Sequence, residues 1–317
     1  MNNKDFDIII LATKKNLSTL EIMLPYCKKN LPAKHIYIVS NRGIKADIER
    51  LPEAEFVDEE SVLDGLNIDK IFDIIEERCG QRKRAGWYLQ QFLKMAWCNR
   101  CLDSSYIVID ADTFPLNPIE YLDVEGKYLF TSKIEYNKPY FDTIETLFNG
   151  DVRKCGPFSF VAENMIFDTA IMKEMIERIE ANTKLKGKFF YEKIMYAINV
   201  DDLLRSGFSE FETYGNFLMT YYPSKAALRK LRTNREAAYI LGELPTAEQL
   251  KWAEHSYDII SVEASVENTI HKKSIMKTIT SWSITRSVFS MKTLSNMRSF
   301  VRSVYRKALG REDFKFE

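Results

Sequence analysis

Two short apolar runs on either side of a helical stretch, within the first 40 residues, limit the possible folds most strongly. Residues 7–12 and 35–40 are rich in β-branched side chains, and residues 16–30 repeat their apolar positions with helical spacing. Pro25 is expected to kink this helix or to end it early. A strand, a helix and a strand in this order form a βαβ unit with parallel strands and a right-handed crossover. We therefore predict an α/β fold with a mixed, mostly parallel sheet flanked by helices.

The rest of the chain continues this alternation of apolar runs and amphipathic stretches. Further strands are predicted at residues 106–109, 128–132, 159–167 and 259–262. Further helices are predicted at residues 68–79, 85–102, 168–181, 186–197, 201–206, 224–232 and 246–255. We expect residues 1–265 to form one α/β domain and residues 266–317 to form a basic amphipathic helical tail.

The composition is that of a folded chain with a sizeable core, because 45% of its 317 residues are apolar and 13% are aromatic. Its 45 Lys and Arg residues equal its 45 Asp and Glu residues in number, so the total charge indicates no partner. The apolar run at residues 8–12 is too short for a signal peptide. No run approaches the roughly 20 apolar residues that span a bilayer, and we expect a cytoplasmic protein.

The five cysteines form no even disulfide framework, which is typical of a reducing compartment. Cys98 and Cys101 match the CxxC pattern, but they lie in a predicted helix and lack a second pair of ligands. Burial on the helix explains this pair better than a metal or redox role.

The segment IVIDADTFPL at residues 107–116 ends a predicted strand with two aspartates one residue apart. Ligands of open α/β sheets bind at the carboxyl ends of the strands, which is where these aspartates fall. Neighbouring carboxylates repel each other unless a cation lies between them, and their hard oxygens suit Mn²⁺ or Mg²⁺. A turn in which Asp110 accepts hydrogen bonds from backbone amides ahead of Pro115 explains the pattern equally well.

The chain contains the four segments GWYLQQFLKM at 86–95, YIVIDADTFPLNPI at 106–119, SFVAENMIFD at 159–168 and FSEFETYGNF at 208–217. Their order resembles that found in a bacterial branch of the nucleotide-diphospho-sugar transferases. Over residues 5–265 the chain resembles these glycosyltransferases of GT-A fold, which are often encoded for capsule or surface polysaccharide. The resemblance implies a nucleotide-sugar donor, usually UDP-linked, and a glycan or lipid-linked saccharide acceptor. It also implies Mn²⁺ or Mg²⁺ held by Asp110 and Asp112, where the metal would stabilise a diphosphate leaving group.

Other residues are predicted to contact the donor and its metal. Trp87, Gln90 and Lys94 are three or four residues apart, so they share one side of a helix. Lys94 is placed to reach a phosphate and Gln90 a sugar hydroxyl, whereas Trp87 fits a core position equally well. The full set expected at the cofactor is Thr13, Asn41, Trp87, Gln90, Lys94, Asp110, Ala111 and Asp112.

The segment SEFETYG is predicted to be a loop that carries two catalytic candidates, Glu210 and Glu212. Inverting transfer requires a carboxylate that accepts the proton of the acceptor hydroxyl, and we assign this role to Glu210. Retaining transfer can use a carboxylate or amide near the anomeric carbon. Phe211 and Tyr214 are expected to form a rim on which sugar rings stack. A solvated acidic turn is the alternative.

Glu163 and Asn164 interrupt an apolar strand, which is costly without polar partners, so we predict that they bind the acceptor or the donor. Many GT-A enzymes add a late histidine to the metal, and His255 and His271 are the candidates here. His271 follows the last predicted strand and is the candidate metal ligand, although a surface position is favoured for each histidine.

The end of the chain differs from the rest in its charge. Residues 271–311 contain ten Lys and Arg residues and no acidic residue, which leaves 35 basic against 45 acidic residues elsewhere. An apolar helical face is predicted beside a basic one, a pattern typical of helices that lie in a membrane interface. The apolar face comprises Met297, Phe300, Val301, Val304 and Tyr305, and the basic face comprises Arg298, Arg302 and Arg306. We expect contact with the anionic inner face of the membrane, with a solvated helix packed on the acidic body as the alternative. Nucleic-acid binding is not favoured, because no recognised motif accompanies the charge.

The main hypothesis is a metal-dependent glycosyltransferase, with three alternatives. A nucleotidyltransferase would carry a glycine-rich basic loop after the first strand, whereas residues 13–16 read TKKN. A sugar-phosphate transferase would release a nucleoside monophosphate instead of a diphosphate. A glycan-binding or scaffolding protein without turnover would release neither.

Overall fold

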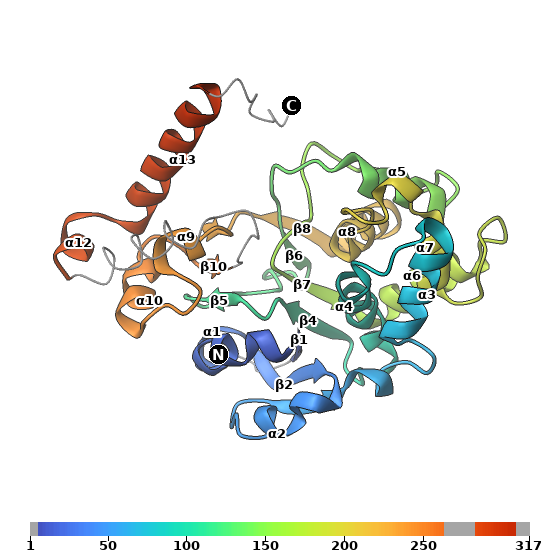
Figure 1. The fold of residues 1–317 in the computed structure, drawn as a ribbon, viewed down its shortest axis with the longest axis horizontal. Helices are drawn as coiled ribbons and strands as arrows, with labels where there is room; N and C mark the ends of the chain where they lie inside the picture. The colour runs from blue at the N-terminus through green and yellow to red at the C-terminus, as the bar shows by residue number, and fades with distance from the viewer. Residues whose placement is uncertain (1–5, 263–282, 309–317) are drawn as a thin grey trace. The chain divides into compact units, whose positions relative to one another are not determined.

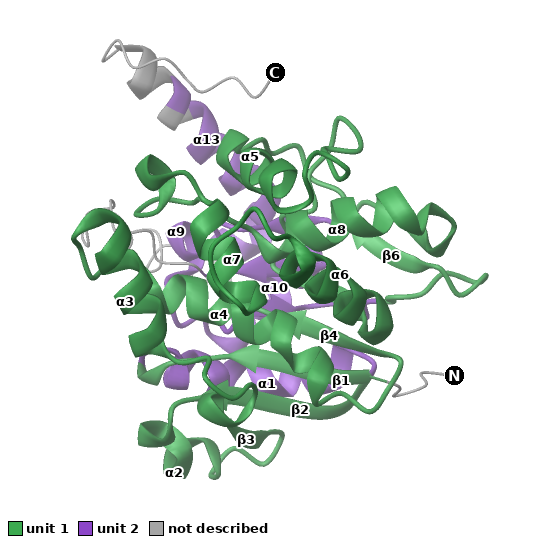
Figure 2. Cartoon of the chain, turned by 90° about the vertical axis from the view of Figure 1, so that its right-hand side faces the viewer, with its two compact units in different colours: residues 1–14, 33–110, 120–230 green, residues 15–32, 111–119, 231–317 purple. Residues whose placement is uncertain are grey.

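The computed structural model describes residues 6–262 and 283–308 (Figure 1). The chain divides into two compact units, each assembled from segments that are distant in sequence (Figure 2). Unit 1 combines the described residues up to 14 with residues 33–110 and 120–230. Unit 2 combines residues 15–32 and 111–119 with the described residues from 231 onward.

Unit 1 is built on a five-stranded sheet in the order β3-β2-β1-β4-β7. The strands are β1 Phe6–Leu11, β2 Ala33–Ser40, β3 Glu55–Asp58, β4 Ser105–Ile109 and β7 Asn164–Asp168. Strand β1 runs parallel to β2 and β4, β2 runs parallel to β3, and β7 is antiparallel to β4. Ile8 lies beside Ile36 and Ile107, and all three are buried, as expected for an apolar strand covered on both faces. The predicted mixed, mostly parallel sheet is confirmed.

Helices flank this sheet in unit 1 (Figure 1). They are α2 Lys45–Ile48, α3 Ile68–Cys79, α4 Ala85–Ala96, α5 Lys138–Leu147, α6 Thr169–Ala181, α7 Phe190–Ala197 and α8 Glu210–Tyr221. Helix α4 contacts β1, and α6 contacts β7. Helix α3 has the predicted bounds because its ends are marked in the sequence: Asn67 accepts a hydrogen bond from Lys70 N, and Gly80 takes the left-handed conformation at φ 69°.

Several connections of the chain are short 3₁₀ turns. They are η1 Lys14–Asn16, η2 Arg42–Ile44, η3 Glu59–Ser61, η4 Trp97–Asn99, η5 Val200–Asp202 and η6 Pro223–Lys225. Helical residues were predicted where η4, η5 and η6 lie. Helix α4 ends at Ala96 and gives way to η4, η5 lies where a helix was predicted at 201–206, and η6 lies at the start of the stretch predicted as a helix at 224–232.

A second, two-stranded sheet in unit 1 corrects one prediction outright. Strand β6, Tyr128–Thr131, pairs in parallel with β8, Ala226–Arg229, so the helix predicted at 224–232 is wrong. The partner strand lies far away in the sequence, and local periodicity does not reveal it. The strand predicted at 159–167 begins only at Asn164, and helix α5 was not predicted.

Unit 2 contains a three-stranded sheet in the order β5-β10-β9 and several helices. Its elements are α1 Leu17–Asn30, β5 Thr113–Pro115, β9 Thr233–Asn234, α9 Ala238–Leu241, α10 Ala247–Glu254, β10 Ile259–Ser261, α12 Ser283–Val288 and α13 Met291–Ala308. Pro25 lies inside α1 and does not end it. The side chain of Asn30 donates a hydrogen bond of 2.7 Å to the backbone oxygen of Pro115, which joins α1 to β5. Of the helices that the structure describes, none combines the length and the hydrophobicity needed to cross a membrane.

Candidate functional site

The order of the strands in unit 1 marks one position where a ligand is expected. Strands β2 and β3 follow on one side of β1 and β4 lies on the other, so the order reverses between β1 and β4. Ligands of such sheets bind outside the carboxyl ends of the strands at this switch point. Thr13 is exposed just beyond the end of β1, and Asp110 directly follows β4. Two of the predicted cofactor residues therefore flank this position.

The Lys94 ammonium group is the centre of a charged cluster at this edge of the sheet. Its Nζ lies 2.8 Å from Oδ1 of Asp110 and 2.7 Å from Oε1 of Glu210. Helix α4 supplies Lys94, the end of β4 supplies Asp110, and the first residue of α8 supplies Glu210. The same Nζ lies 4.6 Å from the centroid of the Phe211 ring. The structure thus joins three predicted site residues from distant parts of the sequence, and we call them the Lys94 cluster.

Burial and charge act in opposite directions on Lys94. Burial alone would lower its pKa, but the carboxylates of Asp110 and Glu210 raise the pKa above the usual lysine value. Lys94 is therefore a fixed cation, and two carboxylates with one ammonium leave one net negative charge. The side chain of Asp110 is 37% exposed and that of Glu210 only 5%, so this charge is accessible at Asp110.

The start of β7 lies at the same edge, because β7 runs antiparallel to β4 and places Asn164 opposite Ile109. The backbone N–H of Asp110 donates to the backbone oxygen of Glu163 at 3.0 Å. The buried Glu163 carboxylate lies 3.4 Å from Nζ of Lys133, and Oδ1 of Asn164 accepts from the Tyr121 hydroxyl at 2.9 Å. These partners explain why two polar residues interrupt an apolar segment.

The prediction that Glu210 and Glu212 lie in a loop is wrong, because α8 begins at Glu210. The Ser209 side chain caps this helix by accepting a hydrogen bond from Glu212 N at 3.3 Å. The two glutamates are two residues apart on the helix and face different neighbours. Glu212 is buried and accepts hydrogen bonds from Ser159 Oγ and, at 3.1 Å, from Asn216 Nδ2. Burial raises the pKa of Glu212, which the Ser159 hydroxyl partly offsets.

The aromatic rim predicted beside these glutamates is also wrong. Both Phe211 and Tyr214 are buried, so neither offers a surface on which a sugar ring could stack. The Tyr214 ring packs edge-on against Phe167 with 4.8 Å between the centroids. The Tyr214 hydroxyl accepts a hydrogen bond of 2.8 Å from Asp168 N. Tyr214 is therefore part of the interior of unit 1.

The other helix residues expected at the cofactor are half-buried. The Arg84 guanidinium lies over the Trp87 ring at 4.4 Å from its centroid, and Gln90 is half-exposed. The neighbouring Gln91 was missed, although it lies three residues before Lys94 and shares its side of the helix. Its Oε1 accepts a hydrogen bond of 3.2 Å from Glu210 N, so Gln91 fixes the start of α8 beside the Lys94 cluster.

Asn41 follows β2 and closes an exposed turn, because its Oδ1 accepts a hydrogen bond from Gly43 N at 2.9 Å.

Cys98 and Cys101 are both buried, and burial raises the pKa of Cys98 to about 12, which keeps it a thiol. Their burial agrees with the packing explanation of the CxxC pattern.

Asp112 belongs to unit 2 and is described there. Its backbone oxygen accepts from Val262 N at 2.9 Å, and its Oδ1 lies 3.4 Å from the Thr113 hydroxyl. The preceding Ala111 is buried. His255 is exposed, with Nδ1 3.0 Å from the backbone oxygen of Lys251. His271 lies outside the described residues.

Within the described residues, no three His, Cys, Asp or Glu side chains form a group that could hold a metal ion. The chemistry of Asp110 nevertheless suits a hard cation, because its carboxylate is partly exposed and carries the surplus charge of the Lys94 cluster. Its Oδ1 accepts a hydrogen bond from Lys94 and not from a backbone amide ahead of Pro115. The turn proposed as the alternative role of this carboxylate is therefore not what holds Asp110.

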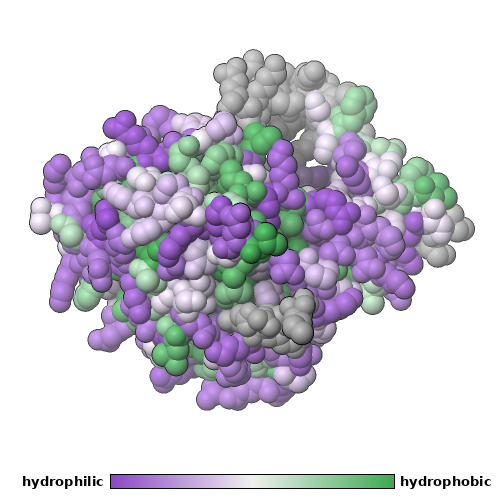
Figure 3. All heavy atoms as spheres, turned by 180° about the vertical axis from the view of Figure 1, so that it is seen from behind, coloured by the Kyte–Doolittle hydropathy of each residue, from purple (hydrophilic) through white to green (hydrophobic). Residues whose placement is uncertain are grey.

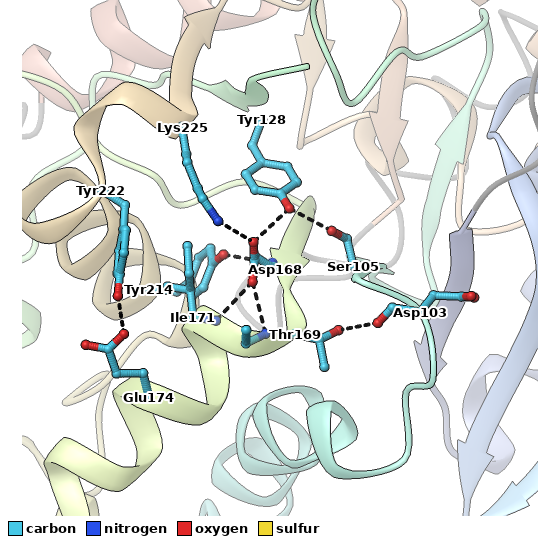
Figure 4. Close-up of polar contacts among 11 residues, drawn as sticks. Asp103, Ser105, Tyr128, Asp168, Thr169, Ile171, Glu174, Tyr214, Tyr222 and Lys225 are labelled. Atoms are coloured by element: carbon cyan, nitrogen blue, oxygen red, sulfur yellow. Dashed lines mark hydrogen bonds and ion pairs between the residues drawn. The ribbon is translucent and has the colours of Figure 1, made fainter. Parts of the chain in front are cut away.

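A second buried cluster lies at the opposite end of β4, around Asp168 (Figure 4). Oδ1 of Asp168 accepts from Ala170 N at 2.9 Å and from Ile171 N at 3.0 Å, which caps helix α6. Oδ2 accepts from the Tyr128 hydroxyl at 2.9 Å and from Lys225 Nζ at 3.1 Å. Every oxygen of this buried carboxylate has donors within the fold, so the Asp168 cluster is explained by structure alone.

Comparison with known proteins identifies a family, and the solved structures that match include a distantly related transferase. The model of DUF6492, a family of unknown function, matches residues 35–286. No curated protein matches the sequence. The apo crystal structure of mouse xyloside xylosyltransferase 1 is 13% identical over 84% of this chain and 99% of that chain, with a TM-score of 0.40.

Proposed function

We propose that this chain, which belongs to the DUF6492 family, is a glycosyltransferase. It would move a sugar from a nucleotide-diphosphate donor, of which UDP-sugars are the first to test, to a glycan or lipid-linked saccharide such as a surface-polysaccharide precursor. One observation carries the proposal: a partly exposed carboxylate, Asp110, lies at the switch point of a mostly parallel sheet beside a buried, fixed cation.

A divalent cation would give this carboxylate its role. Asp110 and Asp112 are one residue apart in the sequence and both offer hard oxygens, which suits Mn²⁺ or Mg²⁺ with further positions taken by water and phosphate. When bound, such a cation neutralises charge that develops on a departing diphosphate. Asp110 would hold the cation with the oxygen that does not face Lys94.

Lys94 and Glu210 receive a supporting role in this proposal. The carboxylate of Glu210 is buried and bound to Lys94, which leaves it poorly placed to accept a proton from a sugar hydroxyl. We assign it instead to hold Lys94, and Lys94 in turn fixes the orientation of Asp110. The buried Lys94–Glu210 pair carries no net charge, and Lys94 holds the exposed carboxylate of Asp110 in place. No mobile counterion is therefore needed to orient Asp110.

The experiment measures thermal unfolding of the full chain with a panel of nucleotide sugars, with Mn²⁺ or with chelator. We expect a UDP-sugar to raise the melting temperature only with metal, because a ligand stabilises the folded state by about 2.7 kcal/mol at 100 times its Kd. Asp110→Asn should abolish this rise. Asp168→Asn makes the same charge change at the other end of β4 and should leave the rise intact.

The reaction product separates the proposal from its alternatives. Release of a nucleoside diphosphate on addition of acceptor supports a glycosyltransferase, and release of a monophosphate indicates a sugar-phosphate transferase. Ligand binding without any release indicates a glycan-binding protein. Equal stabilisation by the UDP-sugar in chelator would contradict the role of the metal.

A further inference from the structure

Helix α13 is held against the rest of unit 2 by one of its sides. Met291 is fully buried, and Ser295 Oγ accepts a hydrogen bond of 2.9 Å from Asn234. Arg298 forms an ion pair with Glu236 and lies 3.7 Å from the centroid of the Tyr239 ring. Residues 291, 295 and 298 are spaced by four and three, so they form one continuous side of the helix. This side is the anchored side of α13.

A different side of the same segment exposes large apolar residues. Met297 is 54% exposed and Phe300 is 70% exposed, and their spacing of three places them together on the helix. Val288 and Phe289, just before α13, are also exposed. We call Met297 and Phe300 the apolar tail surface. On the face seen from behind, hydrophilic residues predominate and apolar residues are seen mainly near the middle (Figure 3).

The sequence around this surface carries charge of one sign. Residues 271–311 contain ten Lys and Arg residues and no Asp or Glu. Lys292 on α13 is exposed, whereas Arg298 is already paired with Glu236 and holds the helix in place. Exposed apolar side chains within a segment whose Lys and Arg residues meet no Asp or Glu in its sequence complement a surface that is anionic outside and apolar beneath.

We propose that the apolar tail surface docks onto an anionic lipid bilayer, with Met297 and Phe300 entering the headgroup boundary. The anchored side keeps α13 on unit 2 while the exposed side contacts lipid. A second copy of the chain fits this surface less well, because it would bring two basic segments together. A nucleic acid would satisfy the charges but would leave the apolar side chains unexplained. The inference does not depend on the proposed activity.

The test is co-sedimentation of the full chain with vesicles of phosphatidylglycerol and phosphatidylcholine, compared with phosphatidylcholine alone. The wild type should bind the anionic vesicles, and binding should weaken as salt is raised. Met297→Ser with Phe300→Ser should lower the partition coefficient by about tenfold. The double change removes from the interface the exposed parts of two large apolar side chains. Lys292→Glu should lower it by a smaller factor.

The control changes two apolar residues elsewhere that are even more exposed than Met297 and Phe300. Leu102→Ser with Val124→Ser replaces fully exposed side chains of unit 1 and should leave vesicle binding unchanged. Thermal unfolding of each variant checks that it is folded. The inference would be overturned if the Met297/Phe300 variant bound the anionic vesicles as well as the wild type does. It would also be overturned if the wild type bound anionic and neutral vesicles equally well. A wild-type dimer that the same variant converts to a monomer would overturn it too, since a second copy would then cover the surface.

Discussion

At the amino end of β4, the Asp168 carboxylate is surrounded by backbone amides, a tyrosine hydroxyl and one lysine, whereas at the carboxyl end Lys94 lies between two carboxylates. Around Asp168, both carboxylate oxygens accept hydrogen bonds from donors of the fold. Around Lys94, one net negative charge remains, and it lies at the Asp110 side chain, which water can reach. Two buried polar clusters in one unit therefore differ in what remains for a ligand, and only the Lys94 cluster keeps unmatched charge.

Helix α8 takes part in both clusters. Its first residue, Glu210, contacts Lys94, and Tyr214, about one turn later, accepts a hydrogen bond from Asp168 N. A substitution in the Lys94 cluster can thus be compared with a substitution in the Asp168 cluster, because both clusters contact the same strand, β4, and the same helix, α8. Stability should respond at both ends, but donor binding should respond only at the Lys94 cluster.

The largest effect is expected from Lys94→Met. The substitution leaves the buried Glu210 carboxylate without its ammonium partner, and breaking a buried pair in this way costs about 3–5 kcal/mol. The free energy of unfolding from urea denaturation at pH 7 measures the loss. The donor-induced rise in melting temperature should also disappear, because Asp110 loses the cation that orients it.

Two variants control for this result. Lys34→Met breaks an ion pair with Asp103 of similar length, 2.9 Å, but Lys34 is 45% exposed and water screens the pair, so the expected loss is much smaller than for Lys94→Met. Adding Glu210→Leu to Lys94→Met should recover most of the stability, since an apolar replacement of both partners removes the unpaired charge. Equal losses for Lys94→Met and Lys34→Met would show that burial does not set the strength of the Lys94 cluster.

An intermediate effect is expected from Asp168→Ala. It removes the cap of α6 together with the contacts to Tyr128 and Lys225, and we expect a loss of about 2 kcal/mol. Donor-induced stabilisation measured on the same variant should remain, because no residue of the Lys94 cluster changes. A variant that lost donor binding while staying folded would place Asp168 in the functional site and remove the contrast between the two ends.

The sequence was sufficient for the parallel strands and for helices with marked ends. Residues 68–79 were predicted with the correct bounds because an asparagine cap, an apolar stripe and a terminal glycine agree with one another. Strand β8 was mistaken for a helix because its stability comes from pairing with β6, which lies almost 100 residues away in the sequence. Strands β5 and β9 have three and two residues, too few to show a period.

For the site, the sequence indicated individual residues but not their contacts. Lys94 and Asp110 were both expected at the sheet edge, yet nothing in the spacing showed that Glu210 lies on the other side of Lys94. The segment containing Glu210 was predicted to be a loop, whereas Ser209 caps a helix in which both glutamates are buried. Burial also turned Tyr214 from a proposed surface residue into a core residue, and tertiary packing alone decides that.

The smallest effect is expected at Glu212, which lies on α8 between Glu210 and Tyr214 and tests whether the protonated or the ionised carboxyl group suits this buried position. Burial raises the pKa of Glu212 above its ordinary value of 4.5. Below that value both the folded and the unfolded chain hold the proton, and the carboxyl group contributes its full stability. As the pH rises through the raised pKa, the unfolded chain loses the proton more readily, so this contribution is lost.

Glu212→Gln cannot ionise, and the difference in unfolding free energy between this variant and the wild type should therefore move in favour of the variant between pH 4 and pH 7. Urea denaturation at several pH values measures this shift. Ser159 Oγ and Asn216 Nδ2 donate to different oxygens of Glu212, and Gln keeps only one acceptor oxygen, so one of these hydrogen bonds is lost in the variant. That loss does not vary with pH, so the change with pH reports the charge alone. A difference that does not change with pH would mean that Glu212 ionises as freely in the fold as in water. The buried side of α8 would then tolerate the charge of Glu212 without a cationic partner. Burial would in that case no longer explain why Glu210 is paired with Lys94.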